Sequence, residues 1–277
     1  MSESFLKNLK KLLADVLAAE PEFYRKKYLN AVIDDDCIRN LDEERFKTLP
    51  AATKEEIARA PYAGRLYQEG SGITKLIPCV EAGRSFLLHR TLEEIKEDDL
   101  PYEGARPMVL MSNMYEAIER CLFFYERNIL PLIGEFRNPA VAVSSARQYN
   151  IDALVMDHTA VLQYRRMLCA LNLNIQSVTV VDSTFHKDDF SGWPPETTKY
   201  FVVSFPETGR LAYSCPRAAA EDKLVLHPYP DVYIEPSALS VITSVRFKSC
   251  PMIRYRAPVY FEDVRSVCGC GKASFAL

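Results

Sequence analysis

The sequence predicts an α/β protein with an N-terminal helical region, a twisted and mostly parallel sheet flanked by helices, and a β-rich C-terminal segment. Three observations lead to this fold class: an amphipathic helical pattern at the start, short apolar runs alternating with helical patterns in the middle, and β-branched and aromatic stretches toward the end. We expect these parts to cover residues 1–60, 61–205 and 206–277 and to form one compact unit.

The helical region opens with apolar residues on one face of residues 4–19, and Pro21 follows where that helix should end. Two capping-box patterns come later, at Thr53–Glu56 and Thr91–Glu94. In each, the threonine hydroxyl and the glutamate carboxylate can exchange hydrogen bonds with the first backbone N–H groups of a helix. We therefore expect helices to begin at both places.

In the middle of the chain, short apolar runs alternate with helical patterns, which favours parallel βαβ units. Strands are expected at 108–111, 140–143, 153–156, 177–181, 200–205 and 239–245, and helices at 115–125 and 158–171. Residues 187–199 contain Gly192 and two prolines and predict a surface loop. Trp193 in this loop is expected to pack as a plug, and the alternative is that it contacts a partner.

Composition excludes several classes of function. The 277 residues carry a net charge of -3 and no basic patch interleaved with aromatic residues, so no nucleic-acid partner is expected. Charges interrupt the apolar positions of the first residues, and no apolar run approaches the roughly 18 residues of a membrane span. We expect a cytoplasmic protein without a membrane partner, and eight scattered cysteines that remain reduced.

Glycine is scarce, with 10 in the chain, and only one stretch resembles a phosphate-binding loop. Residues Gly70–Lys75 offer two glycines, two hydroxyls and a lysine, which together can turn N–H groups and a positive charge toward phosphate oxygens. The alternative is a turn that uses Gly70 and Gly72 for positive φ angles.

Four side chains have the types and number that a tetrahedral structural Zn²⁺ site takes. They are Cys215, His227, Cys268 and Cys270. The alternative is that Cys215 is a core residue, that His227 is a surface residue before Pro228, and that the cysteine pair is a turn.

Several short segments follow one another along the chain, and their order is stronger evidence for a family resemblance than any single segment. They are Phe23–Tyr28, Leu49–Ile57, Ser71–Lys75, Val203–Cys215, Val225–His227, Val232–Glu235, Ile242–Ser244 and Pro251–Arg256. Together they resemble the large N-terminal domain of adenylate-forming ligases of the phenylacetate-CoA ligase type. The resemblance implies ATP and a small carboxylate as substrates, and an acyl-adenylate that CoA, a carrier protein or another thiol would attack.

The resemblance also implies site residues. The nucleotide, as ATP or AMP, would be bound by Ser71, Gly72, Thr74, Lys75, Glu207, Thr208 and Arg254. Glu207 would hold Mg²⁺ beside ATP, an ion that proteins bind through one or two carboxylates plus substrate phosphates. Two positions depart from the pattern: Lys75 stands where a glycine is usual, and Val259 where an aspartate grips the ribose. No catalytic residue is assigned, because the lysine of the small domain has no counterpart.

Two hypotheses follow. In the first, the chain is an AMP-forming acyl-CoA ligase-like protein that is incomplete without a small catalytic domain. A separate polypeptide would supply that domain, or the chain would perform only the first half-reaction. The alternative is a catalytically inactive descendant that acts as a binding or scaffold protein, which Val259 favours. In either case the carboxylate pocket is expected among residues Met111–Phe124 and Ala142–Asp157.

Overall fold

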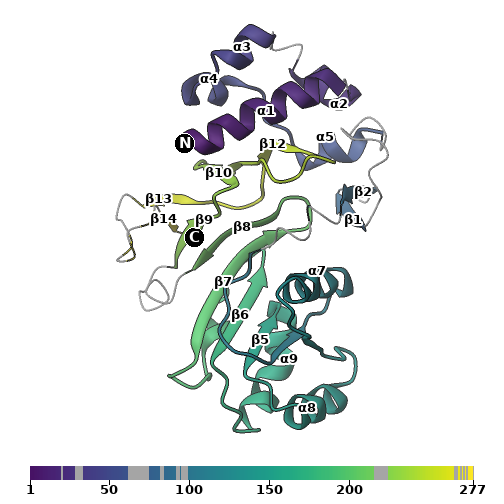
Figure 1. Cartoon of the computed structure of the whole chain (residues 1–277), viewed down its shortest axis with the longest axis vertical. Helices are drawn as coiled ribbons and strands as arrows, with labels where there is room; N and C mark the ends of the chain where they lie inside the picture. The colour runs from purple at the N-terminus through teal and green to yellow at the C-terminus, as the bar shows by residue number, and fades with distance from the viewer. Residues whose placement is uncertain are drawn as a thin grey trace. The chain divides into compact units, whose positions relative to one another are not determined.

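The structure is a computed structural model that describes residues 1–19, 21–28, 34–61, 75–81, 84–91, 94, 99–214, 224–264, 268, 270, 272 and 274–276. Of residues 75–81 and 84–86 only the backbone is described. The chain divides into two compact units (Figure 1): the first unit is 1–94, 206–209 and 228–262, and the second unit is 95–205, 210–227 and 263–277. Among the described residues, no helix is both long and apolar enough to cross a membrane.

Helices dominate the first part of the first unit. They are α1 (Glu3–Ala19), α2 (Glu22–Tyr28), α3 (Asp35–Arg39), α4 (Glu43–Thr48) and α5 (Lys54–Arg59). The predicted amphipathic helix is confirmed as α1, which buries Leu9, Leu13 and Val16 in a core shared with α2, α3 and α4. The capping box at Thr53 is also confirmed, with both reciprocal hydrogen bonds present at the start of α5.

Two small antiparallel sheets complete the first unit. Strands β1 (Lys75–Glu81) and β2 (Arg84–Arg90) form a hairpin, and β10 (Val232–Glu235), β11 (Val241–Ser244) and β12 (Met252–Arg256) form a three-stranded sheet. Ala52 joins this sheet to α5 through a parallel bridge to Tyr255. The second capping pattern is confirmed by its contacts, since Thr91 N donates to Glu94 Oε2 at 2.8 Å and Glu94 N donates to Thr91 Oγ1 at 3.3 Å.

The second unit is built on most of a nine-stranded sheet. Its elements are β3 (Pro107–Leu110), α7 (Met114–Tyr125), β4 (Leu132–Ile133), α8 (Pro139–Gln148), β5 (Ala153–Met156), α9 (His158–Cys169), β6 (Ser177–Asp182), the 3₁₀ turn η3 (Lys187–Phe190), β7 (Thr198–Phe205), β8 (Gly209–Ser214), β9 (Val225–Pro228), β13 (Glu262–Val264) and β14 (Ser274–Ala276). The strand order is β13-β14-β9-β8-β7-β6-β5-β3-β4.

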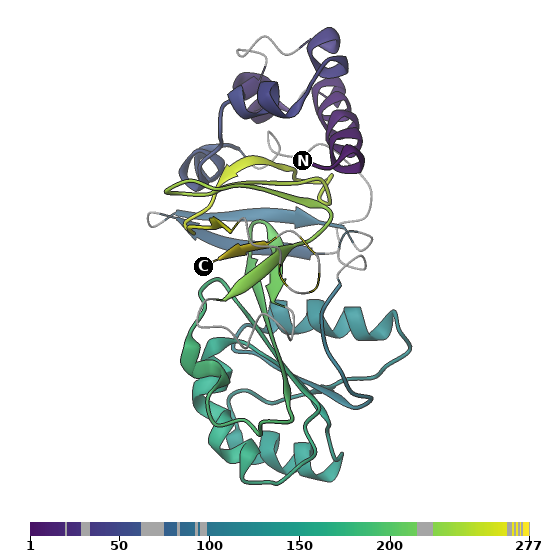
Figure 2. The same ribbon diagram turned by 90° about the vertical axis from the view of Figure 1, so that its left-hand side faces the viewer.

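Strands β4, β3, β5, β6 and β7 are parallel, as the βαβ pattern predicted. The chain passes from β3 to β4 on one side and then returns to β5 on the other, so the order reverses between β3 and β5. Right-handed crossovers place α7 on one face of the sheet and α8 and α9 on the other, an arrangement that can be followed in Figure 2. The predicted fold class is confirmed.

One predicted strand is wrong. Residues 140–143 lie in α8, whose N-cap Asn138 accepts a hydrogen bond from Val141 N and whose first residue is Pro139. Proline at the first helical position and a capping asparagine before it both favour a helix start. Ala142 is buried on the face toward the sheet while Val141 is exposed, so the short apolar run reflects a helix and not a strand.

Candidate functional site

The predicted phosphate loop can be followed only at its end. Ser71, Gly72 and Thr74 lie outside the described residues, as does Cys215 of the predicted metal site. Lys75 is the first residue of β1 and pairs with Arg90 across the hairpin. The phosphate loop therefore stays a prediction, with its downstream end fixed on a hairpin of the first unit.

Glu207 and Thr208 lie in the tight turn between β7 and β8 and are almost fully buried. Gly209 ends this turn with a φ of +62°, a left-handed conformation that a glycine adopts without cost. A Cβ at Gly209 would lie 2.8 Å from Cζ of Phe247, so the turn packs directly against that ring. The turn is therefore a tightly fixed part of the first unit.

Lys54 neutralises the buried Glu207 carboxylate. The Lys54 ammonium lies 2.5 Å from Oε1 of Glu207, whose side chain is 2% exposed. That oxygen makes no hydrogen bond of good geometry, so the contact is mainly one of charge. Lys54 is the first residue of α5, next to the cap Thr53. A lysine ammonium thus lies against the carboxylate that the sequence predicted to hold Mg²⁺.

Arg90 fixes the backbone of the same turn. Its guanidinium donates to the carbonyl oxygens of His89, Cys250 and Glu207, and it lies 3.8 Å from the ring centroid of Phe247. Charge-assisted hydrogen bonds and a cation–π contact together hold this buried arginine in one position. The Glu207 turn is thereby tied to β2, the strand that pairs with the one beginning at Lys75.

Arg254, also predicted to bind the nucleotide, makes several contacts within the protein. Its Nε and Nη2 atoms donate to the two carboxylate oxygens of Glu235 at 2.9 and 2.7 Å, and Nη1 donates to the carbonyl of Leu49. Its backbone has a φ of 48°, which is uncommon for a residue with a side chain. These contacts join β12, β10 and the segment before α5, and a nucleotide role for Arg254 stays a prediction.

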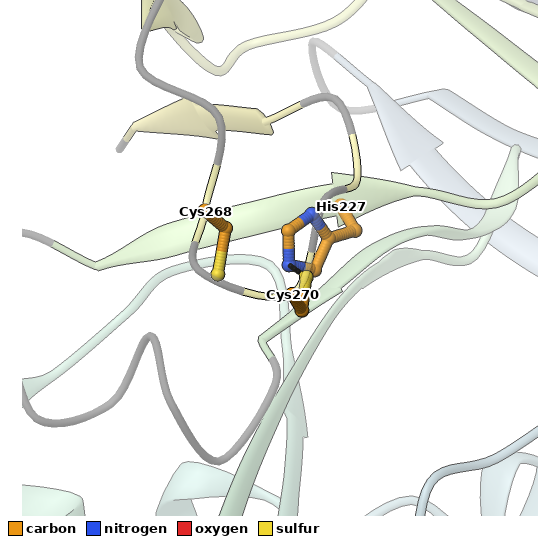
Figure 3. Close-up of side chains that lie close together, drawn as sticks. All are labelled: His227, Cys268 and Cys270. Atoms are coloured by element: carbon orange, nitrogen blue, oxygen red, sulfur yellow. Dashed lines mark hydrogen bonds between the residues drawn. The ribbon is translucent and has the colours of Figure 1, made fainter.

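The structure brings together three of the four predicted zinc ligands (Figure 3). The ligand atoms of His227, Cys268 and Cys270 all lie within 4.8 Å of one another. Cys270 Sγ is 3.3 Å from His227 Nε2. Ligand atoms in a tetrahedral zinc site lie about 3.6 Å apart, given Zn–N and Zn–S bonds of roughly 2.1 and 2.3 Å. The three atoms are thus grouped more loosely than in an occupied site, and the zinc site stays a prediction.

The segment that carries the two cysteines is also held by other contacts. Strand β14 pairs with β9, with Phe275 opposite Leu226, so the chain end lies beside the strand of His227. Lys272 Nζ donates to the hydroxyl of Tyr213 at 2.6 Å, and the Tyr213 ring packs edge-on against His227. An ion at this place would join two segments that are already neighbours, which is the role of a structural metal.

A hollow of about 440 Å³ lies elsewhere in the second unit, lined by Arg106, Leu130, Tyr149 and Ile151 among others. It opens at the amino-terminal ends of β3 and β5. Ligands of open parallel sheets bind outside the carboxyl ends of the strands, at the point where the strand order reverses. This hollow is therefore at the wrong edge of the sheet for a substrate.

Lys54 and Arg90 are the functional candidates that sequence reasoning missed. Both lie beside a predicted helix cap, since Lys54 follows the capping Thr53 and Arg90 precedes the capping Thr91. A basic residue beside a helix cap has no sequence pattern that would mark it as a site residue. Only the folded chain brings these two residues to a glutamate more than 100 positions later.

The fold is that of adenylate-forming ligases. A crystal structure of 2-hydroxyisobutyryl-CoA ligase in the postadenylation state, in complex with its 2-HIB-AMP adduct, is similar over 99% of this chain, with a TM-score of 0.76 and 13% identity. An open conformation of that ligase in complex with 2-HIB-AMP and CoA gives a TM-score of 0.75 over 98% of the chain, with 12% identity. An amide bond synthetase from Marinactinospora thermotolerans is similar over 64% of the chain, with a TM-score of 0.50 and 10% identity.

The present chain spans 66% of the length of the postadenylation ligase, 72% of the open form and 41% of the amide bond synthetase. No protein family matches the chain by sequence, and no curated protein matches it in sequence. At 10–13% identity the likeness concerns the fold. It supports the adenylate-forming ligase resemblance, without separating the phenylacetate-CoA ligase type from other ligases of this fold.

Proposed function

We propose that this chain binds ATP or AMP together with a small carboxylate and forms an acyl-adenylate, which CoA, a carrier protein or another thiol then attacks. The proposal rests on a similarity of fold. It extends over 98–99% of the chain, and the matched ligase was crystallised with an acyl-AMP adduct and, in one structure, also with CoA. A phenylacetate-CoA ligase-like subtype is proposed from the sequence motifs alone.

The buried turn at Glu207 supports the nucleotide part of the proposal. A carboxylate that is 2% exposed is costly unless it is paired, and here it is held beside Lys54 and a backbone fixed by Arg90. Lys54 lies against Oε1, so a Mg²⁺ ion at Glu207 would have to displace Lys54 or bind through the other carboxylate oxygen.

The alternative function is a catalytically inactive descendant that binds a ligand or serves as a scaffold. It is favoured by Val259, whose carbonyl oxygen accepts a hydrogen bond from Ser240 N at 2.9 Å and whose side chain offers no group for ribose hydroxyls. A small catalytic domain on a separate polypeptide is a further proposed partner, and it rests on the sequence resemblance alone.

The test combines binding with the first half-reaction. Thermal unfolding is measured with AMP, with ATP and Mg²⁺, and with no ligand, since a ligand at 100 times its dissociation constant stabilises by about 2.7 kcal/mol. Carboxylate-dependent exchange of labelled pyrophosphate into ATP is then measured with a panel of acids. Stabilisation with exchange supports the ligase, stabilisation without exchange supports the inactive descendant, and no stabilisation at millimolar nucleotide contradicts nucleotide binding.

We also propose a structural Zn²⁺ held by His227, Cys268, Cys270 and Cys215. The donor set is one that zinc prefers, and three of its atoms already lie within 4.8 Å of one another. When bound, the ion would supply folding free energy and no chemistry.

A further inference from the structure

A histidine and a buried aspartate form a pair at the carboxyl edge of the second unit's sheet. His158 follows β5 directly and begins α9, and its Nδ1 lies 2.7 Å from Oδ1 of Asp189. The Asp189 side chain is 1% exposed, whereas that of His158 is 25% exposed. The other carboxylate oxygen, Oδ2, is buried without a hydrogen-bond partner among the described residues. The charge of this aspartate is therefore directed at the histidine.

The position of Asp189 is fixed by its own surroundings. It lies in η3, and its carbonyl accepts a hydrogen bond from Nε1 of the buried Trp193 at 3.0 Å. Arg165 of α9 donates to the carbonyl of Asp188 and, at 3.0 Å, to the hydroxyl of Ser191. These bonds fasten the turn to the same helix that His158 begins. The pair is thus supported from both sides and does not depend on a single contact.

The pair lies next to the place where the strand order reverses. Ser112 follows β3 and donates from its backbone N and its hydroxyl to Oδ2 of Asp157, at 2.7 and 2.5 Å. Asp157 follows β5, so this bridge marks the carboxyl ends of the two strands between which the order reverses. Ligands of such sheets bind outside this edge. The carboxylate pocket expected from the sequence, among residues 111–124 and 142–157, includes residues at this same edge of the sheet.

The hydrogen bond to Asp189 determines which nitrogen of His158 is available. An ionised carboxylate can only accept, so Nδ1 carries a proton and donates it. In the neutral ring Nε2 then keeps its lone pair and is the nitrogen that Asp189 does not engage. A histidine held in this tautomer by an aspartate is the arrangement that serves as a general base in other enzymes.

Neighbouring groups favour a base over a metal ligand. The ring of His186 stacks on that of His158, with centroids 3.7 Å apart and planes at 22°, so the in-plane lone pairs run side by side and do not converge on one ion. The other charged groups nearby are Asp182, whose Oδ2 accepts from His158 N at 3.2 Å, Asp157 and Arg165.

We propose that His158 is the general base that accepts a proton from the acyl acceptor, a thiol or an amine, and that Asp189 is its positioning residue. This inference rests on the proposed acyl-adenylate chemistry. The sulfur or nitrogen lone pair of the acceptor forms a bond to the acyl carbon, and the acceptor's proton passes to His158 Nε2. The bond from the acyl carbon to the phosphate oxygen breaks, and its electron pair leaves with AMP.

The tautomer can be measured without any substrate. In protein labelled with ¹⁵N-histidine, two-bond ¹H–¹⁵N spectra at pH 7.5 are expected to show His158 with a protonated Nδ1 and an unprotonated Nε2. Asp189→Asn should mix the two tautomers, because a carboxylate that can only accept is replaced by an amide that can also donate. A wild-type His158 ring protonated at Nε2 and not at Nδ1 would overturn the proposal.

Kinetics then test the step itself with His158→Gln, whose amide can still bond to Asp189. Transfer to CoA and to a simple amine is expected to fall about 100-fold or more. Pyrophosphate exchange should not change, and neither should trapping by concentrated hydroxylamine, a strong nucleophile that attacks the acyl carbon without a general base and releases its proton to solvent. The matched control is His186→Gln, which removes the stacked ring but not the bond to Asp189 and should keep most of the transfer rate.

The outcomes separate this inference from the proposed function. Equal losses in exchange, trapping and transfer would show that His158 is structural and would overturn the inference. Unchanged transfer in His158→Gln would overturn it as well. No pyrophosphate exchange by the wild-type chain with any acid would overturn the proposed function, and with it the acyl-transfer role. A selective loss for CoA, or for the amine, identifies which of the two acceptors uses His158.

Discussion

The ammonium nitrogen of Lys54 lies 2.5 Å from Oε1 of Glu207, although 153 residues of chain separate the two. The contact joins the first turn of α5 to the turn before β8, and Arg90 holds the backbone of that turn from β2. Three segments that are remote in the sequence thus meet at one carboxylate. Any cation that Glu207 binds in function must replace or accommodate Lys54.

Replacing Lys54 tests this ion pair. Lys54→Met should lower the free energy of unfolding by about 3 kcal/mol, the lower end of the 3–5 kcal/mol for breaking a buried pair, because Lys54 is itself 27% exposed. The double variant Lys54→Met, Glu207→Gln should recover most of this loss, since no charge is then left unpaired. Urea unfolding measures both, and the control Lys26→Met, at an exposed pair with Glu22, should change stability by less than about 1 kcal/mol.

Metal content tests the proposed zinc site. Protein purified without added metal should contain about one zinc per chain, and a chelator should lower its melting temperature. Cys270→Ser should remove the metal, whereas Cys37→Ser, at another exposed cysteine, should leave it in place. A zinc content near zero, together with unfolding that is indifferent to chelator, would contradict the site.

The Glu43 carboxyl should make the free energy of unfolding depend on pH in the acid range. Hydrogen bonds from the α-ammonium group of Met1, from Lys47 and from Tyr233 lower the pKa of the Glu43 carboxyl to about 2. A lowered folded-state pKa means that the stabilisation is complete above the ordinary glutamate pKa of about 4.3 and is lost as pH falls toward 2. Because Glu43 is 36% exposed and solvent screens it, we expect only about 1 kcal/mol.

The measurement is urea unfolding of the wild type and of Glu43→Gln at pH 3, 5 and 7. The difference in unfolding free energy between them should be largest at pH 7 and should shrink at pH 3. Glu44→Gln, which alters a neighbouring carboxylate that is 88% exposed, is the control and should show little effect at any pH. A difference that stays constant from pH 3 to pH 7 would show that Glu43 contributes by packing and not by charge.

Alanine substitutions at two glycines distinguish the cost of backbone strain from the cost of a steric clash. Gly209 and Gly192 both have positive φ angles, +62° and +75°, but a Cβ at Gly209 would lie 2.8 Å from Phe247, while one at Gly192 would meet only Arg165 Nε at 4.0 Å. Gly192→Ala should therefore cost only the conformational penalty of about 1–2 kcal/mol. Gly209→Ala should cost clearly more and should also weaken nucleotide binding, because it displaces the turn of Glu207. Equal costs at the two positions would mean that Phe247 moves freely.

Much of the second unit could be predicted from local pattern. The strands at 153–156 and 177–181 and the helix at 158–171 were expected because apolar runs and helical periodicity identify buried parallel strands and their crossovers. The error at 140–143 has the same origin, since four apolar or small residues fit a buried strand and the first turn of a buried helix equally well. The edge strand β4, with two residues, is too short to leave any pattern.

The sequence by itself determined the class of fold, the helix caps and the four residue types of a possible zinc site, because each depends on residues near one another or on side-chain chemistry alone. Only the tertiary structure decided which distant groups meet. It placed Lys54 on Glu207, gathered His227 with Cys268 and Cys270, and set Asp189 against His158. The physical reason is that burial makes an unpaired charge costly, so each buried carboxylate had to find a partner, and only the packing of whole elements fixes which partner that is.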